Sequence, residues 1–167
     1  MVPTLVRLVL PRLQIEPRHR LLEIGCGNGT AVAAVADRLS TGSILAIDRS
    51  GAAVARAARR NADHIARGVA RIEHADLSQL AVPVEQFDTA FALNVNLFQA
   101  RGTAAQDAIR RCLRRGGRLV LAYRRPDARH LAARADQISV SLVAGGFVVT
   151  TVEWLGPIEV CLVAAPA

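Results

Sequence analysis

The sequence predicts an α/β fold of the doubly wound type, in which helices cover both faces of a mostly parallel sheet. Short apolar runs typical of strands alternate along the chain with segments of helical periodicity. A glycine-rich turn joins the first apolar run to the first helix. The length of 167 residues is close to the commonest size of one domain. We therefore expect a single domain over residues 1–167.

The first strand–turn–helix unit contains the strongest local signal in the chain. An apolar run at residues 21–24 leads into Gly25, Gly27 and Gly29, and a helix is expected over residues 30–39. Glycines allow a sharp bend and let a ligand approach where a Cβ atom would clash. The helix that follows offers free N–H groups at its start. This turn indicates a nucleotide-like ligand, because a plain turn needs at most one or two glycines.

The second strand ends in a carboxylate. Residues 43–48 form an apolar run that ends at Asp48, where a carboxylate is placed to accept hydrogen bonds from ribose hydroxyls. Ser50 can cap a helix expected over residues 51–66, which Gly68 ends. A third strand is expected over residues 69–74.

The second half of the chain continues the alternation. Thr103 and Gln106 have the spacing of a capping box, which predicts a helix through Arg115. Apolar residues recur at helical spacing from residue 131 to residue 142 and predict the next helix. The remaining strands are expected over residues 87–93, 118–123, 147–153 and 158–164.

Two positions around the glycine turn decide which nucleotide fits. The dinucleotide fingerprint places its third glycine where this chain has Thr30. Glu23 stands two residues before Gly25, and a carboxylate there repels a pyrophosphate but attracts an ammonium or a sulfonium. This acid-x-Gly-x-Gly-x-Gly pattern, followed by Asp48, resembles the class I methyltransferases that use S-adenosylmethionine. The resemblance runs from about residue 21 to the end of the chain.

The resemblance implies a Rossmann-like sheet of seven strands, the last of them antiparallel. It also implies S-adenosyl-L-methionine as cofactor, with S-adenosyl-L-homocysteine as product. Glu23 would orient the amino group of the methionine part of the cofactor. Asp48 would accept hydrogen bonds from the ribose hydroxyls, and Asp76 would accept one from the adenine amino group. The residues expected to bind the cofactor are Glu23, Gly25, Cys26, Gly27, Asn28, Gly29, Asp48, Arg49, Asp76, Leu77, Asn94 and Val95.

The acceptor side is less defined, and no catalytic residue is assigned. Asn96 and Phe98 follow the fourth strand, beside the expected place of the methyl group. Arg124 and Arg125 could bind an acidic acceptor, and His130 could act as a base. Two structural alternatives stay open. The asparagines after the fourth strand could only satisfy loop backbone, and the aspartate after the third could only cap a helix.

Composition narrows the function further. The net charge is +7 and every basic residue is arginine, which fits either solvated helix faces or a surface for RNA. The chain has four Phe, one Tyr and one Trp, so few aromatic side chains are available to stack on bases. Three distant cysteines indicate reduced thiols in a cytoplasm, and no cysteine–histidine cluster predicts a metal site. No apolar run is long enough to cross a membrane, which takes about 20 residues.

The sequence as a whole predicts a methyltransferase that moves the methyl group to a small-molecule acceptor by direct displacement. One alternative is an RNA or protein methyltransferase, and another is an accessory subunit that binds the cofactor without catalysis. An NAD-dependent oxidoreductase is disfavoured by Glu23 and Thr30. Residues 1–15 are expected to form a lid helix over the cofactor, unless the second subunit of a homodimer closes the pocket.

Overall fold

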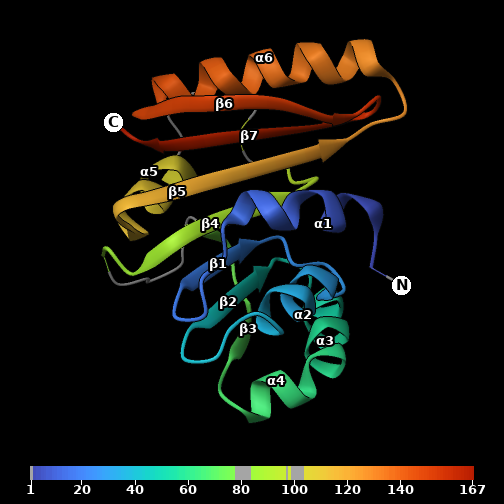
Figure 1. Ribbon diagram of the computed structural model, residues 1–167, viewed down its shortest axis with the longest axis vertical. Helices are drawn as coiled ribbons and strands as arrows, with labels where there is room; N and C mark the ends of the chain where they lie inside the picture. The colour runs from blue at the N-terminus through green and yellow to red at the C-terminus, as the bar shows by residue number, and fades with distance from the viewer. Residues whose placement is uncertain (1, 78–83, 97, 99–103) are drawn as a thin grey trace.

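The fold is known from a computed structural model that describes residues 2–77, 84–96, 98 and 104–167. Its strands are β1 Arg20–Ile24, β2 Ser43–Asp48, β3 Ala70–His74, β4 Phe87–Leu93, β5 Leu113–Arg124, β6 Phe147–Gly156 and β7 Glu159–Pro166. They form one sheet in the order β3-β2-β1-β4-β5-β7-β6 (Figure 1). Strand β7 is antiparallel to β5 and to β6, whereas the pairs among β1 to β5 are parallel. The predicted fold class is confirmed, including the antiparallel last strand.

The helices cover the two faces of this sheet. They are α1 Thr4–Val9, the 3-10 helix η1 Leu10–Leu13, α2 Thr30–Ala36, α3 Gly51–Arg60, α4 Ala62–Ala66, α5 Ala104–Cys112 and α6 Ala128–Ala144. Apolar side chains of α1, α2 and α3 form one core cluster with the sheet. Those of α5 and α6 form the second cluster. Two cores on one sheet are the expected result when parallel strands are buried on both sides.

The strand order reverses between β1 and β4. Strand β1 is parallel to both neighbours, β2 on one side and β4 on the other. The connections from these strands therefore run to opposite faces of the sheet and leave a crevice beyond their carboxyl ends, where open α/β sheets bind ligands.

The helix expected over residues 51–66 is divided at Asn61. Helix α3 ends at Arg60 and α4 begins at Ala62. The Asn61 side chain is fully buried, and its amide nitrogen donates to the carbonyl oxygens of Ala57, at 2.9 Å, and Gly29, at 3.0 Å. This tertiary contact accounts for the break, which helix propensity does not show.

The helix expected to reach Arg115 ends at Cys112. Glu85 and Gln86 donate their backbone N–H groups to the carbonyl oxygens of Arg111 and Cys112, both at 2.8 Å. The chain therefore leaves the helix and enters β5 at Leu113, opposite Phe87 of β4. The predicted capping box cannot be followed, because Thr103 lies outside the described residues.

The first helix packs on the sheet. Leu5, Val6 and Val9 of α1 are buried in the cluster that includes Phe91 and Val120. Its role as a lid over the cofactor stays a prediction. Among the described residues, no helix has both the length and the apolar character that crossing a membrane requires.

Candidate functional site

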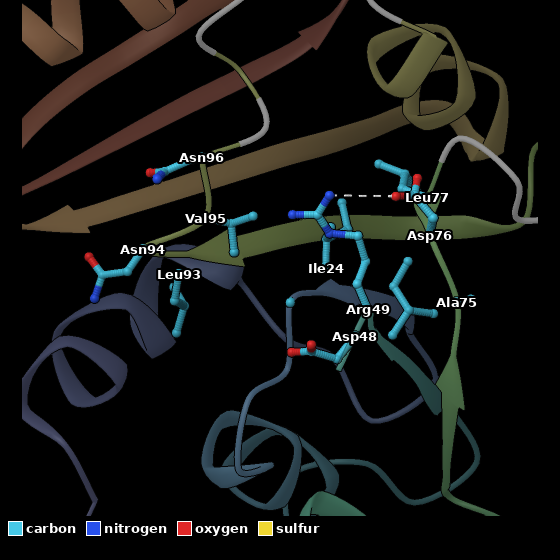
Figure 2. A pocket seen from close by; sticks show the side chains of 12 residues that line it. Ile24, Asp48, Arg49, Ala75, Asp76, Leu77, Leu93, Asn94, Val95 and Asn96 are labelled. Atoms are coloured by element: carbon cyan, nitrogen blue, oxygen red, sulfur yellow. Dashed lines mark ion pairs between the residues drawn. The ribbon is translucent and has the colours of Figure 1, made fainter. Parts of the chain in front are cut away.

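A cavity of about 470 Å³ opens at the carboxyl ends of β1, β2, β3 and β4 (Figure 2). This is the edge of the sheet where the strand order reverses. Its lining residues are Ile24, Gly25, Ile47, Asp48, Arg49, Ala75, Asp76, Leu77, Leu93, Asn94, Val95 and Asn96. Seven of the predicted cofactor residues and one predicted acceptor residue, Asn96, are among them.

The three glycines of the turn all adopt positive φ, but for different reasons. A Cβ atom on Gly25 would lie 2.6 Å from Val95 Cγ2, and one on Gly29 would lie 2.8 Å from the Cα atom of Ala57. A Cβ atom on Gly27 would have no neighbour within 4 Å. Packing within the protein thus favours glycine at two of the positions, whereas the space beside Gly27, which does not line the cavity, holds no protein atom.

Asp48 connects the end of β2 to the glycine turn. Its Oδ2 accepts the backbone N–H of Gly27 at 2.9 Å, and its Oδ1 accepts that of Ser50 at 2.9 Å. These bonds fix the carboxylate while leaving lone pairs on both oxygens. The side chain is therefore held in position at the cavity wall with capacity for further donors, such as a ribose diol.

Glu23 lies in β1, beneath the turn, and is 2% exposed. Its Oε2 is buried without a hydrogen-bond partner in the described part of the chain. Burial, followed by the nearby negative charge of Asp48, raises the pKa of the Glu23 carboxyl well above its ordinary value. A cationic ligand group close to the turn would offset both effects, so this residue fits the ammonium and sulfonium of S-adenosylmethionine.

Arg49 and Asp76 lie on the other wall of the cavity. Arg49 Nη1 is 3.8 Å from Asp76 Oδ2, and the two side chains face each other in Figure 2. Leu77 beside them is buried. A carboxylate, a planar guanidinium and an apolar side chain are suited to an adenine ring and its amino group.

Five of the predicted cofactor residues do not line the cavity: Glu23, Cys26, Gly27, Asn28 and Gly29. Cys26 is buried, which raises the pKa of its thiol to about 12, and its backbone N–H donates to the carbonyl of Ile47 at 3.0 Å. The Asn28 Oδ1 accepts the hydroxyl of Thr30 at 2.7 Å, and Arg60 Nε donates to the Asn28 carbonyl at 2.9 Å. Cys26 and Asn28 both shape the turn.

The asparagines after β4 have partners within the protein. Asn94 has a φ of 58°, and its Oδ1 accepts the backbone N–H of Arg124 at 2.8 Å. Asn96 Oδ1 accepts from Arg134, whose guanidinium carbon lies 4.8 Å from the centre of the Tyr123 ring. The bond to the backbone of Arg124 agrees with the alternative in which Asn94 serves to satisfy backbone groups.

The other predicted acceptor residues lie away from the lining. Phe98 is fully buried in the core on the α5 and α6 face. Arg124 pairs with Glu159 at 3.2 Å, and Arg125 donates its backbone N–H to Ile158 at 3.0 Å. His130 is exposed at the start of α6 and pairs with Asp127 at 2.7 Å.

Sequence reasoning missed the apolar lining and the support of the turn. The apolar lining residues Ile24, Ile47 and Leu93 stand at or beside the last position of a predicted strand, which is a signal that could have identified them. Asn61 carries no such signal, because its contact with Gly29 spans 32 residues of sequence.

Comparison with known proteins agrees with this geometry. A family model described as a methyltransferase domain matches residues 21–117. An O-methyltransferase from Pyrenophora dematioidea is 32% identical over 114 residues, which cover 68% of this chain and 42% of that protein. The chain thus spans less than half the length of this curated relative.

Solved structures with low identity share the fold. A SAM-dependent methyltransferase from Aquifex aeolicus matches with a TM-score of 0.79 and 15% identity, over 95% of this chain and 88% of that one. The cyclase SpnF matches with a TM-score of 0.79 and 21% identity, over 97% and 80% of the two chains. A geranyl diphosphate C-methyltransferase from Streptomyces coelicolor A3(2) has a TM-score of 0.78 and 13% identity, over 97% and 79%. The family model, which matches more than half of the sequence, shows that this chain belongs to the methyltransferase-domain family, whose cofactor is S-adenosylmethionine.

Proposed function

We propose that this chain binds S-adenosylmethionine in the cavity and transfers its methyl group to a small-molecule acceptor by direct displacement. The observation that carries the proposal is the pair of carboxylates around the glycine turn. Asp48 is fixed by two backbone N–H groups, and Glu23 is buried with one oxygen unpaired. A turn that served only to join a strand to a helix would not need the second carboxylate, which is costly to bury.

The residues around the cavity have distinct roles in this proposal. Asp48 accepts the ribose hydroxyls, and Glu23 balances the positive charge of the amino acid part of the cofactor, directly or through water. Asp76 accepts a hydrogen bond from the adenine amino group, and Leu77 and Arg49 lie along the adenine ring. Bound S-adenosylmethionine supplies an electrophilic methyl group on a positively charged sulfur.

The described lining offers little help with proton transfer. Asp48 and Asp76 are the carboxylates among those lining residues, which include no histidine, and both have a role in holding the cofactor. The acceptor should therefore be a group that is nucleophilic without a protein base, such as an amine, a phenolate or a thiolate. Alignment of that group with the methyl carbon would then supply much of the rate.

Two observations support a small acceptor. The cavity of about 470 Å³ lies within the usual range for small-molecule sites, about 300–1,000 Å³. One of the similar solved structures is that of a geranyl diphosphate C-methyltransferase, and geranyl diphosphate is a small molecule.

The distribution of arginine weighs against RNA as the acceptor. Arg49 is the arginine found in the described lining of the cavity. Four others, Arg110, Arg111, Arg114 and Arg115, line a separate hollow of about 460 Å³ beside the end of α5 and the start of β5. The start of β5 is at the other end of the strands from the carboxyl ends of β1 to β4 (Figure 1).

Calorimetric titration tests the proposed cofactor, with S-adenosylmethionine and S-adenosylhomocysteine as ligands and NAD as control. Micromolar binding of the first two, roughly −8 kcal/mol, is the expected result. Transfer of a radiolabelled methyl group to panels of phenols, amines and thiols, with transfer RNA and protein as separate arms, then identifies the acceptor class. Failure of both cofactor forms to bind would overturn the proposal.

A second candidate is an accessory subunit that binds the cofactor without catalysis. The observation in its favour is that four predicted acceptor residues lie outside the cavity lining, so few of the described residues are left to recognise an acceptor: Phe98, Arg124, Arg125 and His130. Tight cofactor binding without methyl transfer to any panel would favour this candidate.

A further inference from the structure

Strand β6 is the outermost strand on one side of the sheet. It pairs with β7 on its inner side, and no other described strand pairs with it (Figure 1). An edge strand presents a row of unpaired N–H and C=O groups that can pair with another chain. Natural proteins usually protect such edges with charged side chains, proline or a covering element.

The side chains of β6 leave this edge accessible and apolar. Val148, Val152 and Trp154 are 52%, 47% and 47% exposed, and Trp154 is the one tryptophan of the chain. Val140 and Val143 on the adjacent helix α6 are exposed as well. These five residues are most of the eight large hydrophobic side chains found exposed in the described part of the protein. Exposed aliphatic and aromatic residues gathered on two adjacent elements are typical of an interaction surface.

Strand β6 has irregular register with β7 near Thr150 and Leu155, but it lacks the proline and free charges that usually protect an edge. Its sequence, FVVTTVEWLG, contains no proline and one charged residue. That residue, Glu153, receives a hydrogen bond from Arg12 Nε at 3.1 Å, so its charge is paired within the chain. The rest of the strand is rich in β-branched residues, which favour strand pairing.

Charge distinguishes this edge from the rest of the protein and indicates its partner. The chain has 21 arginines and a net charge of +7, yet residues 135–167 contain no basic residue. Two copies of the protein therefore repel each other over most orientations, and that repulsion is weakest where the β6 edges meet.

We propose that two copies of this chain pair through β6 in antiparallel orientation and join their two sheets across a two-fold axis. An interface of this kind is self-complementary, because the same surface is used by both copies. The pairing segment is Thr151 to Trp154, beyond the bulge at Thr150, where Val152 and Trp154 point to the same face of the sheet. Aromatic and β-branched residues in cross-strand pairs stabilise a sheet. The cofactor cavity lies on β1 to β4 and stays open, so this proposal is independent of the proposed function.

Light scattering after size-exclusion chromatography tests the dimer. The expected mass is twice 17.8 kDa for the wild type. Val152→Lys places two ammonium groups close to the axis, and we expect it to raise the dissociation constant by about tenfold or more, because like charges opposite each other destabilise a sheet. The matched control is Ile65→Lys on α4, where the wild-type residue is also an exposed aliphatic and 37% exposed. This control should remain a dimer.

The single tryptophan gives a second measurement on the unmodified protein. Dilution should shift the Trp154 emission to longer wavelength as the dimer dissociates and the indole meets water. A wild type that is monomeric at all concentrations overturns the proposal, and so does a Val152→Lys variant that remains as dimeric as the control. Calorimetric binding of S-adenosylhomocysteine to Val152→Lys shows whether that variant is folded, and circular dichroism provides the same check if the cofactor does not bind.

Discussion

The two sides of the cavity use their polar groups differently. On the side of β1 and β2, Glu23 has a buried oxygen without a partner among the described residues, and Asp48 accepts hydrogen bonds from the backbone N–H groups of Gly27 and Ser50. On the side of β4, β5 and α6, Asn94 accepts from the backbone of Arg124 and Asn96 accepts from Arg134, while the buried hydroxyl of Tyr123 has no hydrogen-bond partner among the described residues.

This difference indicates what each side is built for. An unsatisfied buried carboxyl group costs more than an unsatisfied hydroxyl once it is ionised, so Glu23 is the stronger indication of a missing ligand. We therefore infer that the first side holds the cofactor. On the second side, Asn94 and Asn96 are bonded to the end of β5 and to α6, so under the proposed function the shape of the cavity there would select the acceptor.

The largest effect is expected at the glycine turn. Gly27→Val should remove detectable binding of S-adenosylhomocysteine, because the side chain fills the space where the ligand approaches. The variant should still fold, with Gly27→Ala as the milder form, since a Cβ atom there meets no protein atom and positive φ costs about 1–2 kcal/mol. Calorimetry measures binding, and circular dichroism measures folding.

Gly29→Val is the matched control. It should lose thermal stability itself, because its Cβ atom would lie 2.8 Å from the backbone of Ala57. If Gly27→Val bound the ligand normally, the turn would be structural only, and the comparison between the two sides would fail.

Removal of the Asp48 carboxylate should have the next largest effect. Asp48→Ala should weaken binding of S-adenosylhomocysteine by about 10- to 100-fold, because hydrogen bonds to a charged group contribute about 1.5–3 kcal/mol. Asp136→Ala, at an exposed position of α6, is the control and should bind normally. Equal affinity of the two folded variants would show that Asp48 only supports the turn.

Glu23→Gln separates binding from stability. The raised pKa of Glu23 means that its contribution to stability is complete below about the ordinary value of 4.5 and is lost as the pH rises through the higher folded value. The ligand-free variant should therefore melt at a higher temperature than the wild type at pH 8, and the difference should disappear near pH 4. Affinity for S-adenosylmethionine should fall by about tenfold, because the ammonium loses its counter-charge.

Thermal melts across this pH range, followed by calorimetry at pH 8, provide the measurement. A variant that is less stable than the wild type at pH 8 would mean that the Glu23 carboxylate has a partner within the protein.

The smallest effect on binding is expected from Arg124→Met. Affinity for S-adenosylhomocysteine should stay within about twofold of the wild type, because Arg124 is committed to Glu159. The free energy of unfolding should fall by about 1–2 kcal/mol, since Glu159 is buried and loses its partner while Arg124 itself is half exposed.

Urea denaturation measures this loss, and the double variant with Glu159→Gln should recover part of it. A large drop in affinity for the single variant would place Arg124 at the cavity and weaken the distinction between the two sides.

The sequence predicted the sheet well, because strand burial and glycine chemistry act locally. The strands over residues 43–48 and 87–93 have the predicted ends, and the order of elements is as expected. Errors occurred where distant segments decide a boundary. Asn61 divides a helix through its bond to Gly29, and contacts with Glu85 and Gln86 end α5 early.

The residues of the cavity also divide into those that local sequence determines and those that distant contacts decide. The sequence by itself determined the glycine turn, the carboxylate that ends β2 and the buried acid beneath them, because each is fixed by positions next to one another in a strand–turn–helix unit. Only the tertiary structure decided that Phe98 packs in the core, that Arg124 and His130 pair with other residues, and that β6 is left as an apolar edge. Those outcomes depend on which segments come together after the sheet forms, and the partners lie too far apart along the chain for a local pattern to reveal them.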